Sequence, residues 1–344
     1  MLRPTHASPL SPNVRAFWNV ARFTALVVTA AVLAGLVFAP DLTLRMAWFG
    51  IVPILPASFL VNAGLWRSVC PIATANMATG ITIGKRPMRG QWIGISAAIG
   101  IFLLFVLVPF RRLALNQDGL VLAGLLVAIV GAAVLLGLRF NMKAGFCNSV
   151  CPILPVEKLY GQSPLLYVRN PRCVPCSLCT KRGCYELGPA EALSGASKGA
   201  DSRRWPMSVN GLFVVAFPGF VYGYFQTSDV QLSEWASVYA TTLTPALVSM
   251  IGFGAIVMLL GVSRRIAVPV LGALAVGVYY WYAGPASADA FSLSVETGLA
   301  LRWMFLALVA AWLTVALRRS TSQPAPGHPV PARRVEPAEL PSIH

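Results

Sequence analysis

The sequence predicts an all-α integral membrane protein with about eight transmembrane helices. Hydrophobic residues make up 56% of the 344 residues and charged residues only 11%, whereas soluble domains contain about 45 to 50% apolar residues. The apolar residues form blocks of about twenty, which is the length of helix that crosses roughly 30 Å of hydrocarbon. Most basic residues fall on alternate loops, as they do when those loops share one side of a bilayer.

The apolar blocks divide the chain into five parts. We predict transmembrane spans at residues 20–39, 44–65, 91–110, 119–140, 208–226, 242–263, 266–284 and 299–317. The parts are an N-terminal segment, a first membrane region with its loop 66–90, an extramembrane domain, a second membrane region and a tail: 1–19, 20–140, 141–207, 208–317 and 318–344. The tail is rich in Pro and Ala and has no apolar period, so we expect it to be disordered.

The basic residues predict an orientation. With the N-terminus in the cytoplasm, 23 of the 27 Lys and Arg residues lie on the inner side. The remaining four, outside, are Arg45, Arg111, Arg112 and Arg302. This bias predicts a multi-pass protein of the bacterial inner membrane with both termini in the cytoplasm. Because the basic residues are scattered between apolar blocks, the net charge of +15 indicates contact with anionic lipid and not with nucleic acid.

A short repeat relates two of the inner loops. The pentapeptide Ser-Val-Cys-Pro-Ile occurs at residues 68–72 and again at 149–153, 81 residues later. Each copy follows a predicted two-helix hairpin that ends on the inner side. We therefore predict that the first four helices are a duplicated hairpin, repeated about an axis along the membrane normal.

All seven cysteines lie on the inner side in this topology. Because the cytoplasm is reducing, disulfides are disfavoured there and thiolates remain free to bind metal. We therefore predict that the cysteines are metal ligands: Cys70, Cys147, Cys151, Cys173, Cys176, Cys179 and Cys184.

Four of them lie within one twelve-residue loop. Cys173, Cys176 and Cys179 are spaced as C-x2-C-x2-C, so their thiolates can reach three corners of a cuboidal cluster, as in [4Fe–4S] ferredoxins. We predict that residues 141–207 form a small ferredoxin-like loop domain. Zinc is the alternative, although structural zinc sites usually draw their ligands from two separated pairs. Cys184 is spaced by four and is followed by Tyr185, so it ligates either this cluster or a second one.

The other three cysteines belong to the repeat. Cys147 and Cys151 are four residues apart and Pro152 follows, which predicts two thiols on one helical face where the fourth span ends. In the first copy, Trp66 stands at the position of Cys147, so only Cys70 remains. A four-cysteine cluster leaves three thiolates over. We thus predict one [4Fe–4S] cluster, and a second only if another ligand completes it.

At these residues the sequence resembles the membrane polyferredoxins of the NapH, NosR and CcoG type, over about residues 20–207. Cys147 and Cys151 match one complete C-x3-C-P motif, and Cys70 with Pro71 matches half of the other. Such proteins commonly hold two ferredoxin motifs, and this chain has one. The resemblance implies that electrons pass between the quinone pool or a soluble donor and a respiratory or maturation partner protein.

The remaining residues restrict the chemistry. The histidines lie in the two tails, at His6, His328 and His344, so a membrane haem is not expected. We predict an electron-transfer subunit at the cytoplasmic face, part of an oxidoreductase system and not a stand-alone enzyme. One alternative is an assembly or maturation factor that reduces a metal or a thiol. Another is a metal-sensing transporter, which the scarcity of ionisable residues in the spans disfavours.

Overall fold

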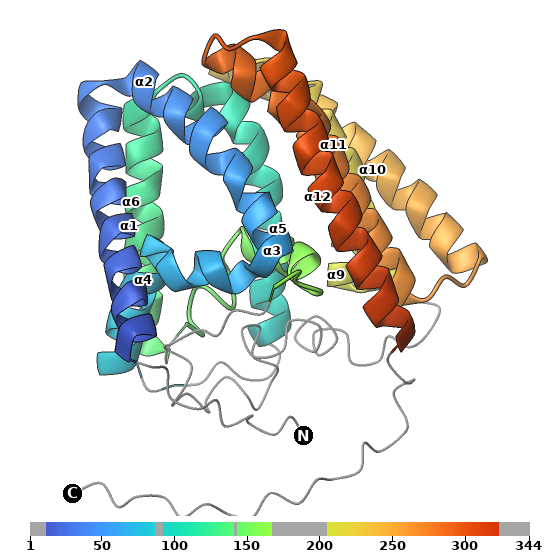
Figure 1. Ribbon diagram of the computed structural model, residues 1–344, viewed down its shortest axis with the longest axis horizontal. Helices are drawn as coiled ribbons and strands as arrows, with labels where there is room; N and C mark the ends of the chain where they lie inside the picture. Colours follow the sequence, from blue (N-terminus) through green and yellow to red (C-terminus); the bar gives the residue numbers. More distant parts are fainter. Residues whose placement is uncertain (1–11, 85, 87–91, 141–142, 167–204, 323–344) are drawn as a thin grey trace, which may run out of the picture.

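The computed structural model describes residues 12–84, 86, 92–140, 143–166 and 205–322, and these ranges are almost wholly helical. Figure 1 shows the helices in chain order. They are α1 (Pro12–Phe38), α2 (Pro40–Arg45), the π-helix η1 (Met46–Ile51), α3 (Val52–Val69), α4 (Pro71–Thr82), α5 (Trp92–Phe110), the π-helix η2 (Arg111–Leu115), α6 (Gly119–Arg139), α7 (Leu154–Tyr160), η4 (Trp205–Met207), α9 (Val209–Phe225), η5 (Leu232–Glu234), α10 (Trp235–Leu259), α11 (Arg264–Ala290) and α12 (Val295–Ser322).

The prediction of an all-α, multi-pass membrane protein is confirmed. Within the described ranges, seven helical segments are long and apolar enough to cross a membrane. They are Pro12–Phe38, Pro40–Val69, Gly94–Leu115, Gly119–Arg139, Leu232–Leu259, Arg264–Ala290 and Val295–Ser320. The fifth predicted span coincides with α9, which is also apolar but has only 17 residues.

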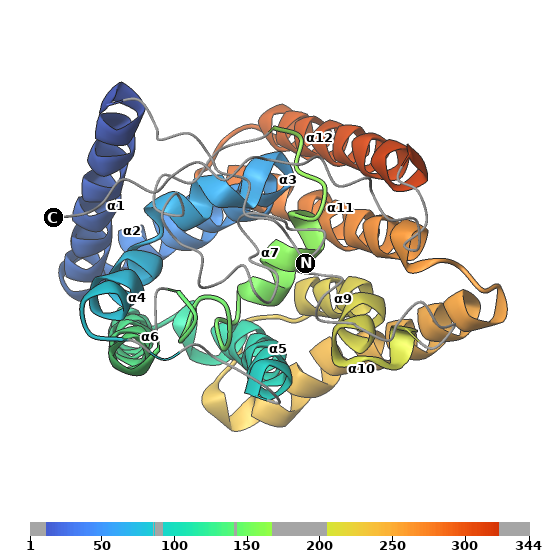
Figure 2. The same ribbon diagram turned by 90° about the horizontal axis from the view of Figure 1, so that it is seen from below.

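The helices form two groups that meet along α3, α7 and α9. Figures 1 and 2 show α1, α4 and α6 on one side of the molecule and α10, α11 and α12 on the other. Large side chains of α3, α7, α9, α11 and α12 share one core, in which Phe59, Tyr160, Phe220, Tyr280 and Trp312 are each at most 2% exposed. The helices α1, α4 and α6 instead contribute to two smaller clusters, one with Leu36 and Leu122 and one with Ala73 and Ala133.

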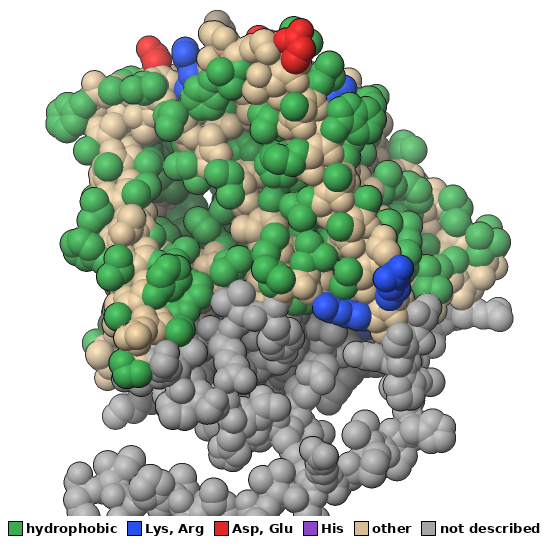
Figure 3. Space-filling model, viewed as in Figure 1, with side chains coloured by type: hydrophobic (Ala, Val, Ile, Leu, Met, Phe, Trp, Pro, Cys, Tyr) green, Lys and Arg blue, Asp and Glu red, His purple; other side chains and the backbone are tan. Residues whose placement is uncertain are grey.

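The charged side chains distinguish the two ends of the bundle. The ends of α3 and α6 lie at what we call the cysteine end, and α2 and the turn between α11 and α12 lie at the far end (Figure 1). On the face drawn in Figure 3, the acidic side chains lie at the far end and basic side chains occur at both ends. Of the acidic residues in the described ranges, Glu157 is the one at the cysteine end.

Helix α3 is interrupted inside the membrane region. Asn62 has extended backbone angles (φ −171°, ψ 115°), so the carbonyl groups just before it lose their helical partners. The backbone N–H groups of Leu165 and Leu166 donate to the carbonyls of Leu60 and Val61, both at 3.0 Å. The Asn62 side chain donates to the carbonyl of Leu166 at 2.7 Å. The break is therefore tolerated because a distant segment satisfies the freed backbone groups.

The loop predicted at residues 66–90 contains a helix. Pro71 stands at the start of α4, a position where the missing N–H costs nothing. Figure 1 shows α4 running across the cysteine end towards α1 and α6. The side chain of Asn76 donates to the carbonyl of Ala133 in α6 at 2.7 Å. A Cβ at Gly137 would overlap the Thr79 hydroxyl, so glycine permits this close crossing.

Two glycines set the contact between α9 and α10. A Cβ at Gly219 would overlap the carbonyl oxygen of Pro245, and one at Gly223 would lie 2.6 Å from that of Thr242. The Gly-x-x-x-Gly spacing therefore lets the two backbones touch. We expect Gly219→Ala to destabilise the protein by about 1–3 kcal/mol, because the helices must separate.

The matched control lies on α10, where a Cβ at Gly252 meets nothing within 4 Å. There, Gly252→Ala is expected to raise stability by up to about 1 kcal/mol through helix propensity. Thermal unfolding of both variants in the same detergent measures the difference. Equal shifts for the two variants would show that the α9–α10 contact is not set by glycine.

Candidate functional site

The structure brings the three repeat cysteines together. Cys147 is buried, and Cys70 and Cys151 pack against it in one small hydrophobic cluster. All three are free thiols. The cluster lies between α4 and the end of α6, at the cysteine end of the bundle. The other four predicted ligands, Cys173, Cys176, Cys179 and Cys184, lie outside the described residues.

The carbonyl of each repeat cysteine accepts a hydrogen bond from the segment that follows its proline. At Cys70 the chain leaves the helical conformation (φ −52°, ψ 122°), and the carbonyl of Cys70 accepts the Thr74 N–H at 3.0 Å. At Cys151 the carbonyl accepts the Leu154 N–H at 3.1 Å. The proline that follows has no N–H, so each cysteine ends one segment and begins the next. The bond spans four residues at Cys70 and three at Cys151, so the two turns are related but not identical.

The predicted helical arrangement of Cys147 and Cys151 is wrong. Helix α6 ends at Arg139, and residues 143–150 form turns. The chain folds back on α6 here. A Cβ added at Gly145 would lie only 2.5 Å from the Leu136 carbonyl oxygen, which shows how closely the two backbones approach. The N–H of Cys151 donates to the carbonyl of Phe146 at 3.1 Å. Turns, and not one helical face, therefore bring the two thiols together.

A buried ion pair lies next to the cysteines. Arg67 donates to a carboxylate oxygen of Glu157 at 2.7 Å, and the two side chains are only 3% and 6% exposed. The same guanidinium donates to the side-chain oxygen of Asn148. Arg67 and Asn148 are 81 residues apart and hold equivalent positions in the two repeats. The two copies thus bind each other through this pair of side chains.

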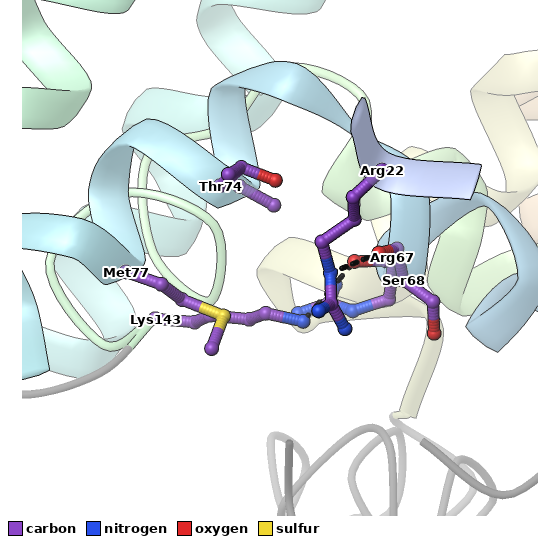
Figure 4. A pocket seen from close by; sticks show the side chains of 7 residues that line it. Arg22, Arg67, Ser68, Thr74, Met77 and Lys143 are labelled. Atoms are coloured by element: carbon purple, nitrogen blue, oxygen red, sulfur yellow. Dashed lines mark hydrogen bonds between the residues drawn. The ribbon is translucent and has the colours of Figure 1, made fainter. Parts of the chain in front are cut away.

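Two further cations cap the end of α3. Arg22 of α1 donates to the carbonyl of Ser68 at 2.9 Å, and Lys143 donates to that of Arg67 at 3.2 Å. Cations at a helix C-terminus are stabilised by its unpaired carbonyls and dipole. Figure 4 shows Arg22, Arg67 and Lys143 approaching one another beside α4.

These residues line a cavity of about 10 Å³, which has room for about one water molecule. The buried hydroxyl of Ser68 lines it and has no hydrogen-bond partner within the described ranges. A water molecule at this point would satisfy that hydroxyl. The equivalent hydroxyl in the second copy, on Ser149, instead donates to the carbonyl of Gly145.

Burial keeps the three thiols protonated in the metal-free protein. Loss of water around Cys147, followed by the effect of the neighbouring Cys70, raises its pKa to about 12, and the charges of Arg67 and Lys143 act in the opposite direction. Burial also raises the pKa of Cys70, and it raises that of Cys151 well above the usual value. A metal must therefore displace protons from these thiols, so metal affinity at this site should increase with pH.

The segment that leads to the cysteine loop is fixed to the membrane helices. Besides the pairing of Leu165 and Leu166 with the break in α3, Arg319 of α12 donates to the carbonyl of Pro164 at 2.6 Å. On the other side of the loop, the buried indole of Trp205 donates to the carbonyl of Val262 at 3.4 Å. The described residues that flank the segment 167–204 on either side are thus bound to the helices.

The three repeat thiols do not form a site for one metal ion in the described part of the chain. Within the described ranges, no group of three or more His, Cys, Asp or Glu side chains could hold one metal ion. Thiolates are the soft donors that iron–sulfur clusters select.

The comparisons with known proteins give no relative. No family model, no curated protein and no solved structure matches the chain. The chemistry of the site is therefore indicated only by its own residues.

Sequence reasoning missed the charged network beside the cysteines. The topology placed Arg67, Lys143 and Glu157 in inner loops without pairing them. One signal was present, because Arg67 and Asn148 each stand three residues before the cysteine of their repeat. The bond between Arg67 and Glu157, by contrast, joins residues 90 positions apart that no repeat relates.

Proposed function

We propose that this chain is a membrane-bound iron–sulfur protein that relays electrons. The observation that carries the proposal is the meeting of Cys70, Cys147 and Cys151, which come from two copies of a repeat and share one buried cluster. Three thiols held together by a duplicated element are better explained by a shared ligand than by packing alone, which needs no cysteine. The loop motif Cys173, Cys176 and Cys179 supports the same chemistry.

Different residues of the chain would have different roles in this relay. The loop cysteines, with Cys184, would hold a [4Fe–4S] cluster, and the repeat cysteines would hold a second group or complete the first. A cluster of this kind takes up and gives back one electron. The cations Arg67 and Lys143, which lie beside the repeat cysteines, would offset the added negative charge. The apolar side chains around Cys147, among them Ala133 and Phe146, would keep water out.

The proposal also includes the orientation of the protein in the membrane and its redox partners. We propose that the cysteine end faces the cytoplasm of a bacterial inner membrane, because the basic residues favour that side. The electrons would pass between the quinone pool or a soluble donor and a partner complex. The anchoring of Leu165 and Trp205 to the helices supports this role, since a relay needs a fixed distance between its donor and acceptor groups.

Metal analysis with EPR tests the proposal most directly. Anaerobically purified protein is expected to contain iron and acid-labile sulfide, and after reduction to give the low-spin EPR signal of a [4Fe–4S] cluster. That signal should disappear in Cys173→Ser, Cys176→Ser and Cys179→Ser, because each substitution removes a ligand of the loop motif. Protein that contains stoichiometric zinc and no iron would refute the proposal.

A further inference from the structure

An open groove with two arginines lies where α6 ends. Its volume is about 360 Å³, and it is lined by Ile83, Arg86, Leu138 and Arg139, a size within the range of about 300–1,000 Å³ typical of small-molecule sites. The membrane-spanning segment of α6 ends at Arg139. The groove therefore lies at the depth where the head groups of lipids meet the protein.

The two arginines are held side by side by the backbone. Arg86 and Phe140 form an isolated parallel bridge, and the N–H of Arg86 donates to the carbonyl of Arg139 at 3.4 Å. A Cβ at Gly84 would overlap the carbonyl oxygens of Gly137 and Phe140. Because only glycine permits so close an approach, the strand-like contact fixes both arginines at one edge of the groove.

The groove is lined by two basic and two apolar side chains. Both arginines are exposed, and no acidic side chain lines the groove within the described ranges. Ile83 and Leu138 are 56% and 39% exposed. Two guanidinium groups can each bind a phosphate through paired hydrogen bonds, and the exposed aliphatic side chains can lie along an acyl chain. A free phosphate ion would leave those aliphatic side chains without a contact.

We propose that this groove binds one anionic phospholipid, with the head-group phosphate between Arg86 and Arg139 and an acyl chain along Ile83 and Leu138. The binding does not depend on the iron–sulfur centre. Since helix α4 joins the groove to Cys70, the lipid would stabilise the helix that carries one side of the cysteine cluster.

Native mass spectrometry of the full-length protein tests this inference. The protein is released from vesicles that contain equal amounts of phosphatidylglycerol and phosphatidylcholine, and the retained lipids are counted. Wild type should retain phosphatidylglycerol preferentially. Arg86→Gln and Arg139→Gln should each reduce this preference about fivefold, since each basic residue contributes about 1 kcal/mol near an anionic surface. Arg45→Gln removes an exposed arginine of α2 at the far end and should leave it unchanged.

Three results would overturn the inference. One is an unchanged preference in a correctly folded double variant, Arg86→Gln with Arg139→Gln. Should that variant fail to fold, the double variant Arg86→Lys with Arg139→Lys replaces it. If this variant kept the full preference for phosphatidylglycerol, paired hydrogen bonds from arginine would not be the source of the preference. The second is an equal loss in Arg45→Gln. The third is displacement of the lipid by inorganic phosphate alone, which would identify a site for free anions.

Discussion

Glu157→Gln is expected to lower the apparent unfolding temperature of the protein by about 10 °C. The substitution removes the negative charge that pairs with the guanidinium of Arg67, whose side chain is only 3% exposed. Breaking a buried ion pair in this way costs about 3–5 kcal/mol, and each kcal/mol corresponds to roughly 2–4 °C in domains of about 150–250 residues and to somewhat less in a longer chain. Thermal unfolding followed by intrinsic fluorescence in one detergent measures the shift.

An exposed ion pair provides the matched control. Arg112 and Asp229 lie 3.0 Å apart at the far end of the bundle, with side chains 17% and 41% exposed. Asp229→Asn should therefore cost at most about 1 kcal/mol, because solvent screens the pair. The double variant Arg67→Met with Glu157→Met should be less destabilised than either single variant, since neither member of the pair then stays buried without the other. A double variant that is worse than both would contradict this account.

Cys151→Ser is expected to reduce the iron content of the anaerobically purified protein, by about four atoms per chain if the repeat cysteines hold a cluster of their own. Cys70→Ser should have a similar effect, because the two residues occupy equivalent positions in the repeat and pack in one cluster. Cys147→Ser should have a smaller effect, since its repeat partner is already Trp66. Iron analysis, EPR line shape and the midpoint potential of each variant measure these differences.

The result also separates the two groups of cysteines. If Cys70→Ser and Cys151→Ser keep the iron content, line shape and potential of wild type, the loop residues Cys173, Cys176, Cys179 and Cys184 bind the whole centre. The repeat thiols would then have a packing role only. A control for non-specific damage is Ser149→Ala, next to the site, which removes one buried hydroxyl and no thiol, and should leave the iron content unchanged.

The sequence predicted the long helices well because hydropathy and length are local properties. Residues 119–140 were predicted as a span, and α6 runs from Gly119 to Arg139. The sequence did not predict the break of α3 at Asn62, the helix α4 or the turns around Cys147. Each of these depends on partners far away in the chain, such as Leu166 for Asn62 and Ala133 for Asn76. No local pattern displays such partners.

The candidate site was predicted in part for the same reason. The repeat indicated that Cys70 and Cys151 are equivalent, and two copies of one element can meet about a symmetry axis. The structure places these two cysteines and Cys147 in one cluster, while their role as metal ligands remains a prediction. The buried charges around them could not be predicted, because the pairing of Arg67 with Glu157 depends on how α7 packs against α3.

The break in α3 has a consequence for biosynthesis. Asn62 and its partner Leu166 are 104 residues apart, so at about 5–20 residues per second the ribosome needs about 5–20 s to make the partner. During that interval an unpaired carbonyl in hydrocarbon would cost several kcal/mol. We therefore expect helix α3 to enter the bilayer as a continuous helix and to break at Asn62 only when Leu165 and Leu166 are present. By that time the chain has made four of its long apolar segments, from Pro12–Phe38 to Gly119–Arg139.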